Sequence, residues 1–228
     1  MKTILYEMLK PYAEVEYQQF SKELNPGQTK VLGVRIPQIK LLAKKLAQQN
    51  NFAQMHSQIE NFCYMEEKML YGCAVAYSLL PFTQKQTLIK KLLPTCTCWA
   101  ETDTLVSACS FYKQHLQEVW QDLPHFSHGT EFEQRWFFLV QMKYFLTQAY
   151  LPQIFENICR YGQNVYYVNM AKAWLLCEAL IHFYEPTKRF LQSASFHPWV
   201  KHKAIQKACE SYRLTPAQKQ ELKNLLKT

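Results

Sequence analysis

Glycine and long apolar runs are both scarce in this sequence. The chain of 228 residues holds five glycines, and its β-branched residues form only short runs. Strand-rich folds use many glycine-containing turns and β-branched segments, so this composition argues against one. No uninterrupted apolar stretch approaches the ~20 residues that a membrane-spanning helix needs. We therefore expect a protein that does not span a membrane.

The first twenty residues also lack the pattern of a signal peptide. Glu7, Glu14 and Glu16 lie within their apolar pattern, and no small-residue cleavage site follows. A signal peptide would have a clean apolar stretch and such a site. We therefore expect a cytoplasmic protein.

The chain shows no clear pattern for a metal site, a disulfide framework or a paired-carboxylate site. Its eight cysteines are scattered over apolar helical faces, as is typical of small buried side chains. Cys96 and Cys98 stand one residue apart, and no second Cys or His pair lies nearby at zinc-ligand spacing. Glu66 and Glu67 are adjacent, but neighbours on a helix point in different directions, so we expect a solvated face there. We expect no metal.

The positive charge of the chain is concentrated in two segments. The chain has 26 Lys and Arg against 18 Asp and Glu, a net charge of +8. Residues 24–59 contain cations and no acid, and residues 188–227 contain many cations but only two glutamates. Such segments can flank a phosphate backbone or can be solvated helix faces, and charge alone does not decide. The candidate phosphate contacts in them are Arg35, Lys40, Lys44, Lys201, Lys203 and Lys207.

Apolar residues recur at helical spacing almost everywhere, as residues 169–184 illustrate. Prolines fall between such stretches, where helices can begin. These breaks predict roughly ten or eleven helices, grouped in pairs of about 35–40 residues, which is typical of HEAT-like repeats. We therefore predict an all-α fold, a HEAT-like solenoid with a concave basic groove, formed as a single domain over residues 1–228. A compact helical bundle without repeats is the alternative.

Four stretches carry more information than the composition does. They are LGVRIPQIKLLAKKLA (32–47), CWAETDTL (98–105), EFEQRWFFLVQMKYFL (131–146) and YYVNMAKAWLLCEALIHF (166–183). In this order they resemble the bacterial alkylpurine DNA glycosylases built from HEAT-like repeats, the AlkD type, over essentially the whole chain. The resemblance rests on a Gly-Val-Arg-x-Pro turn, on a W-x-x-x-D pair, and on an arginine and a second tryptophan in later helices.

The resemblance implies a set of catalytic residues and an activity. The family's catalytic tryptophan and aspartate correspond to Trp99 and Asp103. Its arginine corresponds to Arg135, and its second tryptophan corresponds to Trp174. The implied activity is hydrolysis of the N-glycosidic bond of cationic N3- or N7-alkylated purines in double-stranded DNA. The implied enzyme is a monofunctional DNA repair glycosylase that needs no metal or organic cofactor, and we expect it to be a monomer.

These residue types fit the chemistry. A cationic alkylated purine is a good leaving group, and its departure builds positive charge on the deoxyribose. An ionised Asp103 would stabilise that charge and orient or deprotonate the attacking water. The π faces of Trp99 and Trp174 attract a cation. The planar fork of Arg135 matches a phosphate beside the lesion.

Each of these residues also has a purely structural explanation. Asp103 is of a type favoured at helix starts, where it would accept hydrogen bonds from backbone N–H groups. Trp174 lies on an apolar stripe, as a core tryptophan does, and Trp99 stands at a helix edge where it could be buried. Arg135 is flanked by glutamates and would then form an ion pair on the helix surface.

The sequence departs from better-studied members of the family directly after the tryptophan. Those members have a second aspartate there, whereas this chain has Ala100 followed by Glu101. The ending HPWVKHKAIQKACESYR (197–213) looks like that of a distinct branch, and the resemblance extends to branches that bind DNA without excising bases. The alternative function is therefore a non-catalytic binder of damaged, bent or branched DNA. A third hypothesis is a helical scaffold for a protein partner.

Overall fold

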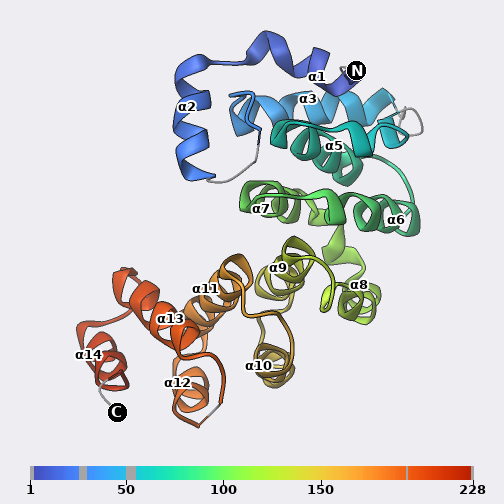
Figure 1. Cartoon of the computed structure of the whole chain (residues 1–228). Coiled ribbons are helices and arrows are strands. Elements are labelled where there is room, and N and C mark those ends of the chain that lie inside the picture. The colour runs from blue at the N-terminus through green and yellow to red at the C-terminus, as the bar shows by residue number, and fades with distance from the viewer. Residues whose placement is uncertain (1–2, 26–29, 50–54, 194, 227–228) are drawn as a thin grey trace. The chain divides into compact units, whose positions relative to one another are not determined.

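The computed structural model describes residues 3–25, 30–49, 55–193 and 195–226, which are mostly helical (Figure 1). The α-helices are α1 (Ile4–Leu9), α2 (Val15–Leu24), α3 (Ile36–Gln49), α5 (Met65–Tyr77), α6 (Phe82–Leu92), α7 (Trp99–Ala108), α8 (Leu116–Asp122), α9 (Glu131–Val140), α10 (Leu151–Arg160), α11 (Tyr166–His182), α12 (Tyr184–Ser193), α13 (Pro198–Glu210) and α14 (Pro216–Asn224). Within these ranges the β-type pairing is limited to an isolated bridge between Lys30 and Tyr64. The predicted all-α fold is confirmed.

The chain divides into two compact units, Met1–Gln121 and Asp122–Thr228, and each is described by itself. In the first unit, α3 packs against α5 and α5 packs against α7 (Figure 1). In the second unit, α9 packs against α11 and α11 packs against α13. We call α3, α5 and α7 the first row, and α9, α11 and α13 the second row. Helices α1 and α6 contact α5, while α12 contacts α11 and α14 contacts α13.

Two helices of these rows are buried along almost their whole length. In α5 every residue from Met65 to Ala76 is buried, and in α9 every residue from Phe132 to Val140 is buried. A helix that is covered on all sides belongs to the core of its unit. Tyr71 of α5 and Trp136 of α9 are among the largest fully buried side chains. Both helices also carry buried charged residues, which need partners inside the protein.

The starts of α5, α7 and α9 repeat one another. In each helix the third residue is a buried glutamate that accepts a hydrogen bond from the backbone N–H of the residue before the helix. These pairs are Glu67 with Tyr64 (2.8 Å), Glu101 with Cys98 (3.3 Å) and Glu133 with Thr130 (2.8 Å). The glutamates are 34 residues apart (101 − 67) and 32 residues apart (133 − 101). The chain is therefore built from helical repeats, slightly shorter than the predicted period.

Candidate active site

Helix α7 exposes one narrow stripe of side chains. Trp99, Asp103 and Ser107 are each at least partly accessible, and every other residue of this fully described helix is buried. Residues four apart lie one turn apart on the same side of a helix. The tryptophan and aspartate predicted to be catalytic therefore lie together on the accessible side of α7.

The first turn of α7 is capped by Glu101 and not by Asp103. The Glu101 carboxylate accepts hydrogen bonds from the backbone N–H groups of Thr97 (2.5 Å) and Cys98 (3.3 Å). Asp103 is the fifth residue of the helix, half-buried, and accepts a hydrogen bond from the Thr102 hydroxyl at 3.3 Å. The hypothesis that Asp103 caps the helix is therefore wrong.

The indole of Trp99 is fixed by a hydrogen bond to a neighbouring helix. Its Nε1–H donates to the backbone carbonyl of Leu24, the last residue of α2, at 3.0 Å. The side chain is half-buried, so the ring is held at the edge of the first unit and is not part of its core. A fixed ring orientation suits a side chain that must present a π face to a cation.

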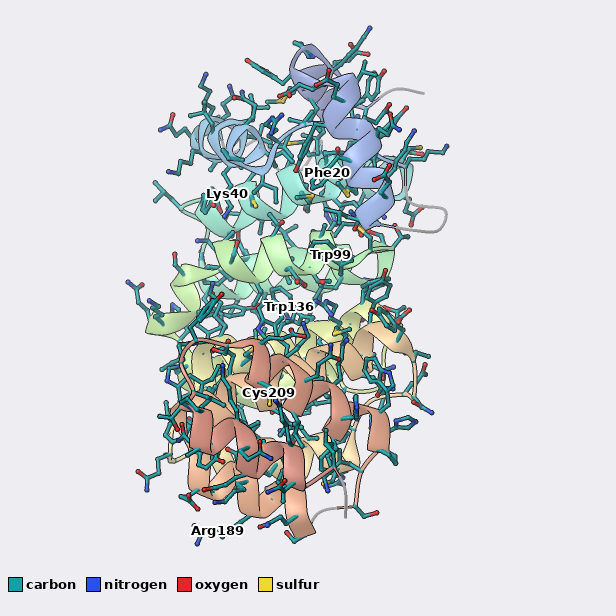
Figure 2. All side chains as sticks on the ribbon, turned by 90° about the vertical axis from the view of Figure 1, so that its left-hand side faces the viewer. Phe20, Lys40, Trp99, Trp136, Arg189 and Cys209 are labelled. Carbon is teal, nitrogen blue, oxygen red and sulfur yellow. The ribbon has the colours of Figure 1, made fainter. Side chains whose placement is uncertain are left out.

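A lysine from α3 reaches the same stripe. Lys40 Nζ donates a hydrogen bond to Ser107 Oγ at 3.3 Å, and Figure 2 shows Lys40 and Trp99 toward opposite ends of α7. Lys44 lies one turn further along α3 and is exposed. The first unit thus brings together an indole, a carboxylate, a hydroxyl and an amine along α7, and the amine belongs to one of the predicted phosphate contacts.

Arg35 forms an ion pair with Glu14. Its Nε–H and Nη2–H groups donate to the two oxygens of Glu14, with the closest contacts at 2.9 Å, and its guanidinium lies 4.8 Å from the centre of the Tyr17 ring. The hydrogen bonds lower the pKa of Glu14 and raise the pKa of Arg35. The Glu14 carboxylate offsets the charge of Arg35, and the contact of Arg35 with DNA stays a prediction.

The Gly-Val-Arg turn is held by a buried acid. Glu66 accepts hydrogen bonds from the backbone N–H groups of Leu32 (2.9 Å), Gly33 (2.8 Å) and Val34 (3.3 Å). Gly33 has φ of 95°, and a Cβ there would lie 2.5 Å from the carbonyl oxygen of Glu14. Burial raises the pKa of Glu66, and the three N–H donors oppose that rise.

The predicted solvated face at Glu66 and Glu67 is therefore wrong. Both residues are buried. Glu67 caps α5 through the backbone N–H groups of Cys63 and Tyr64, and it accepts a hydrogen bond from the Thr3 hydroxyl. Both carboxylates hold backbone in place, and neither belongs to a paired-carboxylate site.

In the second unit, Arg135 is the fifth residue of α9, as Asp103 is of α7. Its side chain is buried, with 3% of the residue exposed, and Nη1–H donates to the backbone carbonyl of Tyr167 at 3.0 Å. Burial excludes an ion pair at the helix surface, so that explanation is wrong. The guanidinium lies at the first turn of α11, where Glu131 also accepts a hydrogen bond from the Tyr167 N–H at 2.9 Å.

Trp174 belongs to an accessible stripe of α11 and not to the core. It is 37% exposed, and Tyr166, Met170 and Glu178 lie on the same side at four-residue spacing. The core tryptophan of this unit is Trp136, which is fully buried. The core explanation of Trp174 is therefore wrong, and its catalytic role stays a prediction.

The predicted phosphate contacts of α13 are three lysines. Lys201, Lys203 and Lys207 are half-buried, and none has an ion-pair partner among the described residues. Lys203 donates a hydrogen bond to Gln206 at 3.0 Å. With the exception of Arg35, every predicted site residue lies on a helix of the first or the second row.

Neither a metal centre nor a membrane-spanning helix is found in the described part of the chain. No group of three or more His, Cys, Asp or Glu in the described ranges is arranged to hold a metal ion. Among the same residues, no helix is both long and apolar enough to cross a membrane.

A sequence model of the DNA alkylation repair enzyme family matches residues 1–208. The chain belongs to this family. No curated protein matches the chain. Family membership confirms the resemblance drawn from the four stretches, and it indicates an enzyme of DNA repair that binds DNA.

The sequence analysis missed two residues that lie next to the predicted catalytic pair. Ser107 completes the stripe of Trp99 and Asp103, and its four-residue spacing from Asp103 was a usable signal. Lys68 on α5 approaches the first turn of α7 from inside the protein. A single lysine in a helix is normally read as a surface residue, so no sequence signal pointed to it.

Proposed function

We propose that the protein is a DNA glycosylase that hydrolyses the N-glycosidic bond of cationic N3- or N7-alkylated purines in double-stranded DNA. The observation that carries the proposal is the accessible stripe of α7, where Trp99 and Asp103 lie one turn apart and Asp103 is not used as a cap. A carboxylate and an aromatic face at that spacing can both contact a cationic nucleotide.

The chemistry requires only groups that these side chains supply. The electron pair of the bond between C1′ and the purine nitrogen leaves with the base and neutralises its positive charge. Water adds to C1′, and its proton passes to Asp103 or to solvent. Asp103 stabilises the positive charge that develops on the sugar, and Trp99 presents its π face to the cation. We assign supporting roles at the lesion to Arg135 and Trp174.

The lysines of the two rows are proposed to bind the DNA backbone. Lys40 Nζ is held beside Ser107, one turn from Asp103, where it can contact a phosphate next to the reacting sugar. Lys44 on α3 and the three α13 lysines, Lys201, Lys203 and Lys207, extend this set. The predicted basic groove, the single domain over residues 1–228, the monomeric state and the cytoplasmic location are further parts of the proposal.

A non-catalytic binder of damaged, bent or branched DNA is the second candidate. It is favoured by one observation: the acid nearest to Trp99 in sequence, Glu101, is buried as a cap and cannot take the place of the second aspartate that Ala100 replaces. A binder needs the lysines of the rows but no carboxylate on the stripe.

Release of base from duplex DNA with one N7-methylguanine distinguishes the two candidates. The proposal predicts release above the spontaneous rate measured without protein, and no release of guanine from the undamaged duplex. Tight binding of the lesion duplex without release would establish the non-catalytic binder. Absence of binding to either duplex would favour a scaffold for a protein partner.

A further inference from the structure

A buried ion pair lies beneath the first turn of α7. Lys68 Nζ on α5 is 3.4 Å from Glu101 Oε1, and the two side chains are 8% and 1% exposed. Burial raises the pKa of Glu101, and Lys68 opposes that rise. Removing two charges from water is expensive, and such a pair is weak evidence for a contribution to stability.

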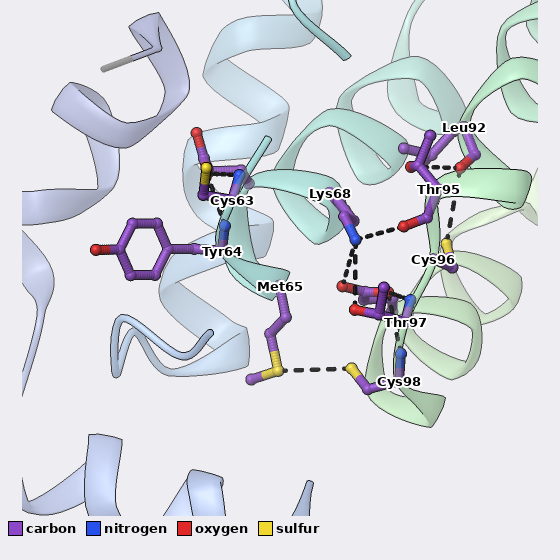
Figure 3. A network of polar contacts seen from close by, with 11 residues as sticks. Cys63, Tyr64, Met65, Lys68, Leu92, Thr95, Cys96, Thr97 and Cys98 are labelled. Atoms are coloured by element: carbon purple, nitrogen blue, oxygen red, sulfur yellow. Dashed lines mark hydrogen bonds and ion pairs between the residues drawn. The ribbon is translucent and has the colours of Figure 1, made fainter. Parts of the chain in front are cut away.

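The pair holds the segment that leads into α7. Lys68 Nζ donates to the backbone carbonyl of Thr95 at 2.5 Å and lies 3.4 Å from the Thr97 hydroxyl. Glu101 accepts the N–H groups of Thr97 and Cys98, so the ion pair fixes both sides of the 95–98 segment (Figure 3). Trp99 is the next residue, and Asp103 follows one turn later.

The other repeats hold the corresponding segments in place without a lysine. In the described part of the chain, neither Glu67 nor Glu133 has a Lys or Arg partner. At the position in α9 that matches Lys68, Gln134 braces the segment before α11, accepting the Gln163 N–H at 2.6 Å and donating to the Gly129 carbonyl at 2.6 Å. A neutral amide is therefore sufficient to brace such a segment, and the charged version occurs under the predicted catalytic pair.

We propose that Lys68 and Glu101 are positioning residues that hold the first turn of α7, and with it Trp99 and Asp103, in the orientation that the substrate requires. This inference rests on the proposed glycosylase function. Neither residue touches the substrate, because both are buried beneath the stripe. A shift of about 1 Å in a catalytic group is enough to reduce a rate about 10²-fold.

The test compares Lys68→Met with Lys85→Met. Both lysines are 7% exposed, and Lys85 Nζ also donates to a backbone carbonyl, that of Ala76, but it lies on α6 and has no acid partner among the described residues. Lys68→Met is expected to lower the single-turnover rate of N7-methylguanine release about 10- to 100-fold, with the dissociation constant of the lesion duplex within about twofold of wild type. Lys85→Met is expected to keep the wild-type rate. A folded Lys68→Met protein with the wild-type rate would overturn the inference.

The double variant Lys68→Met/Glu101→Gln separates positioning from stability. It leaves no unpaired buried charge, and the amide oxygen introduced at position 101 can still accept the backbone N–H groups, so its melting temperature is expected to exceed that of Lys68→Met. The excision rate is expected to stay low. Recovery of the rate together with the melting temperature would mean that the pair serves stability alone, and the inference would fail.

Amide hydrogen exchange keeps the inference testable if the wild type releases no base. That result would contradict the proposed function, but the effect of Lys68 on the 95–98 segment could still be measured. Exchange at the Thr97 and Cys98 N–H groups is expected to be faster in Lys68→Met than in wild type, with no such change in Lys85→Met. Unchanged exchange at both amides would overturn the positioning role.

Discussion

Trp99 and Asp103 lie one turn apart on a helix whose first turn is capped by another residue. Glu101 accepts the backbone N–H groups at the start of α7, which leaves Asp103 on the accessible stripe with a hydrogen bond from Thr102. Trp99 is fixed in a similar way: its indole N–H donates to the Leu24 carbonyl, and the ring stays at the edge of the unit. The acid that caps α7 and the acid predicted to be catalytic are thus different residues within one helical turn.

Two of the three tryptophans of the second unit, Trp136 and Trp174, are expected to respond differently to truncation. Trp136 is fully buried, so Trp136→Ala is expected to lower the free energy of unfolding by about 3–5 kcal/mol. Trp174 is 37% exposed, so Trp174→Ala is expected to have about half that effect or less. Denaturant unfolding of both variants measures the difference. Equal losses of stability in the two variants would indicate that Trp174 is a core residue.

Sequence periodicity could not make this distinction. Helix α11 has apolar residues on both its packed and its accessible side, so the pattern predicts the helix but not which side Trp174 occupies. The pairing of Arg35 with Glu14 was equally hidden, because it joins residues 21 positions apart through the fold. Asp103 and Trp99 were found because their spacing itself is the signal.

At the scale of elements, the turn at residues 32–34 and the helix α5 form one structural piece. Three consecutive backbone N–H groups of the turn donate hydrogen bonds to Glu66. The backbone reaches this conformation through a positive φ at Gly33, which glycine adopts readily. Buried charges of this kind could not be predicted from the sequence. Glu66, Glu67 and Lys68 are adjacent charged residues, which normally mark a solvated face. The partners of Glu66 and Lys68 lie about 30 residues away in the sequence.

Glu66→Gln is expected to destabilise the protein in a pH-dependent way. An amide offers one oxygen and one NH₂ group, so an N–H of the turn would lose its acceptor, at about 1–3 kcal/mol of unfolding free energy near pH 4. The pKa of Glu66 is raised above its ordinary value of 4.5, so the native wild type binds this proton more tightly than the unfolded chain does. The contribution of Glu66 to wild-type stability therefore falls as the pH rises above 4.5. The difference in unfolding free energy between wild type and Glu66→Gln should shrink accordingly.

Urea unfolding of wild type and Glu66→Gln between about pH 4 and pH 7 measures this trend. Glu60→Gln is the matched control, because Glu60 is exposed and its loss should change stability by less than about 0.5 kcal/mol at either pH. A deficit of Glu66→Gln that grows with pH would show that the turn favours the carboxylate, contrary to the direction of the pKa shift.

At the scale of the whole molecule, all the predicted site residues except Arg35 lie on helices of the first or the second row. The fold class and the repeats were predictable, because helical spacing of apolar residues and the scarcity of glycine are local properties of the chain. The repeat itself is clearest in the capping glutamates of α5, α7 and α9, a pattern that needs the helix starts to be known. Which charges face a ligand is a property of packing, so it could not be predicted.

Charge reversal on the first row should weaken DNA binding more than charge reversal outside the two rows. The double variant Lys40→Glu/Lys44→Glu is expected to raise the dissociation constant for any duplex sequence and to flatten its salt dependence, because each phosphate contact contributes a slope of about 0.9 in log K against log salt. The control is Lys91→Glu/Lys113→Glu, two exposed lysines outside the rows. Titrations at about 50 and 200 mM salt measure both slopes. Equal effects of the two double variants would contradict a DNA-binding role of α3.

The central claim is that Asp103 stabilises charge that develops only in the transition state. Asp103→Asn is expected to lower the single-turnover rate of N7-methylguanine release, corrected for spontaneous loss, by about 10²–10³. Its melting temperature and its dissociation constant for the lesion duplex should remain near the wild-type values, because Glu101 supplies the cap. Asp122→Asn, the same change at the chain's other aspartate, should leave the rate unchanged. Wild-type excision by the Asp103→Asn protein would contradict the claim.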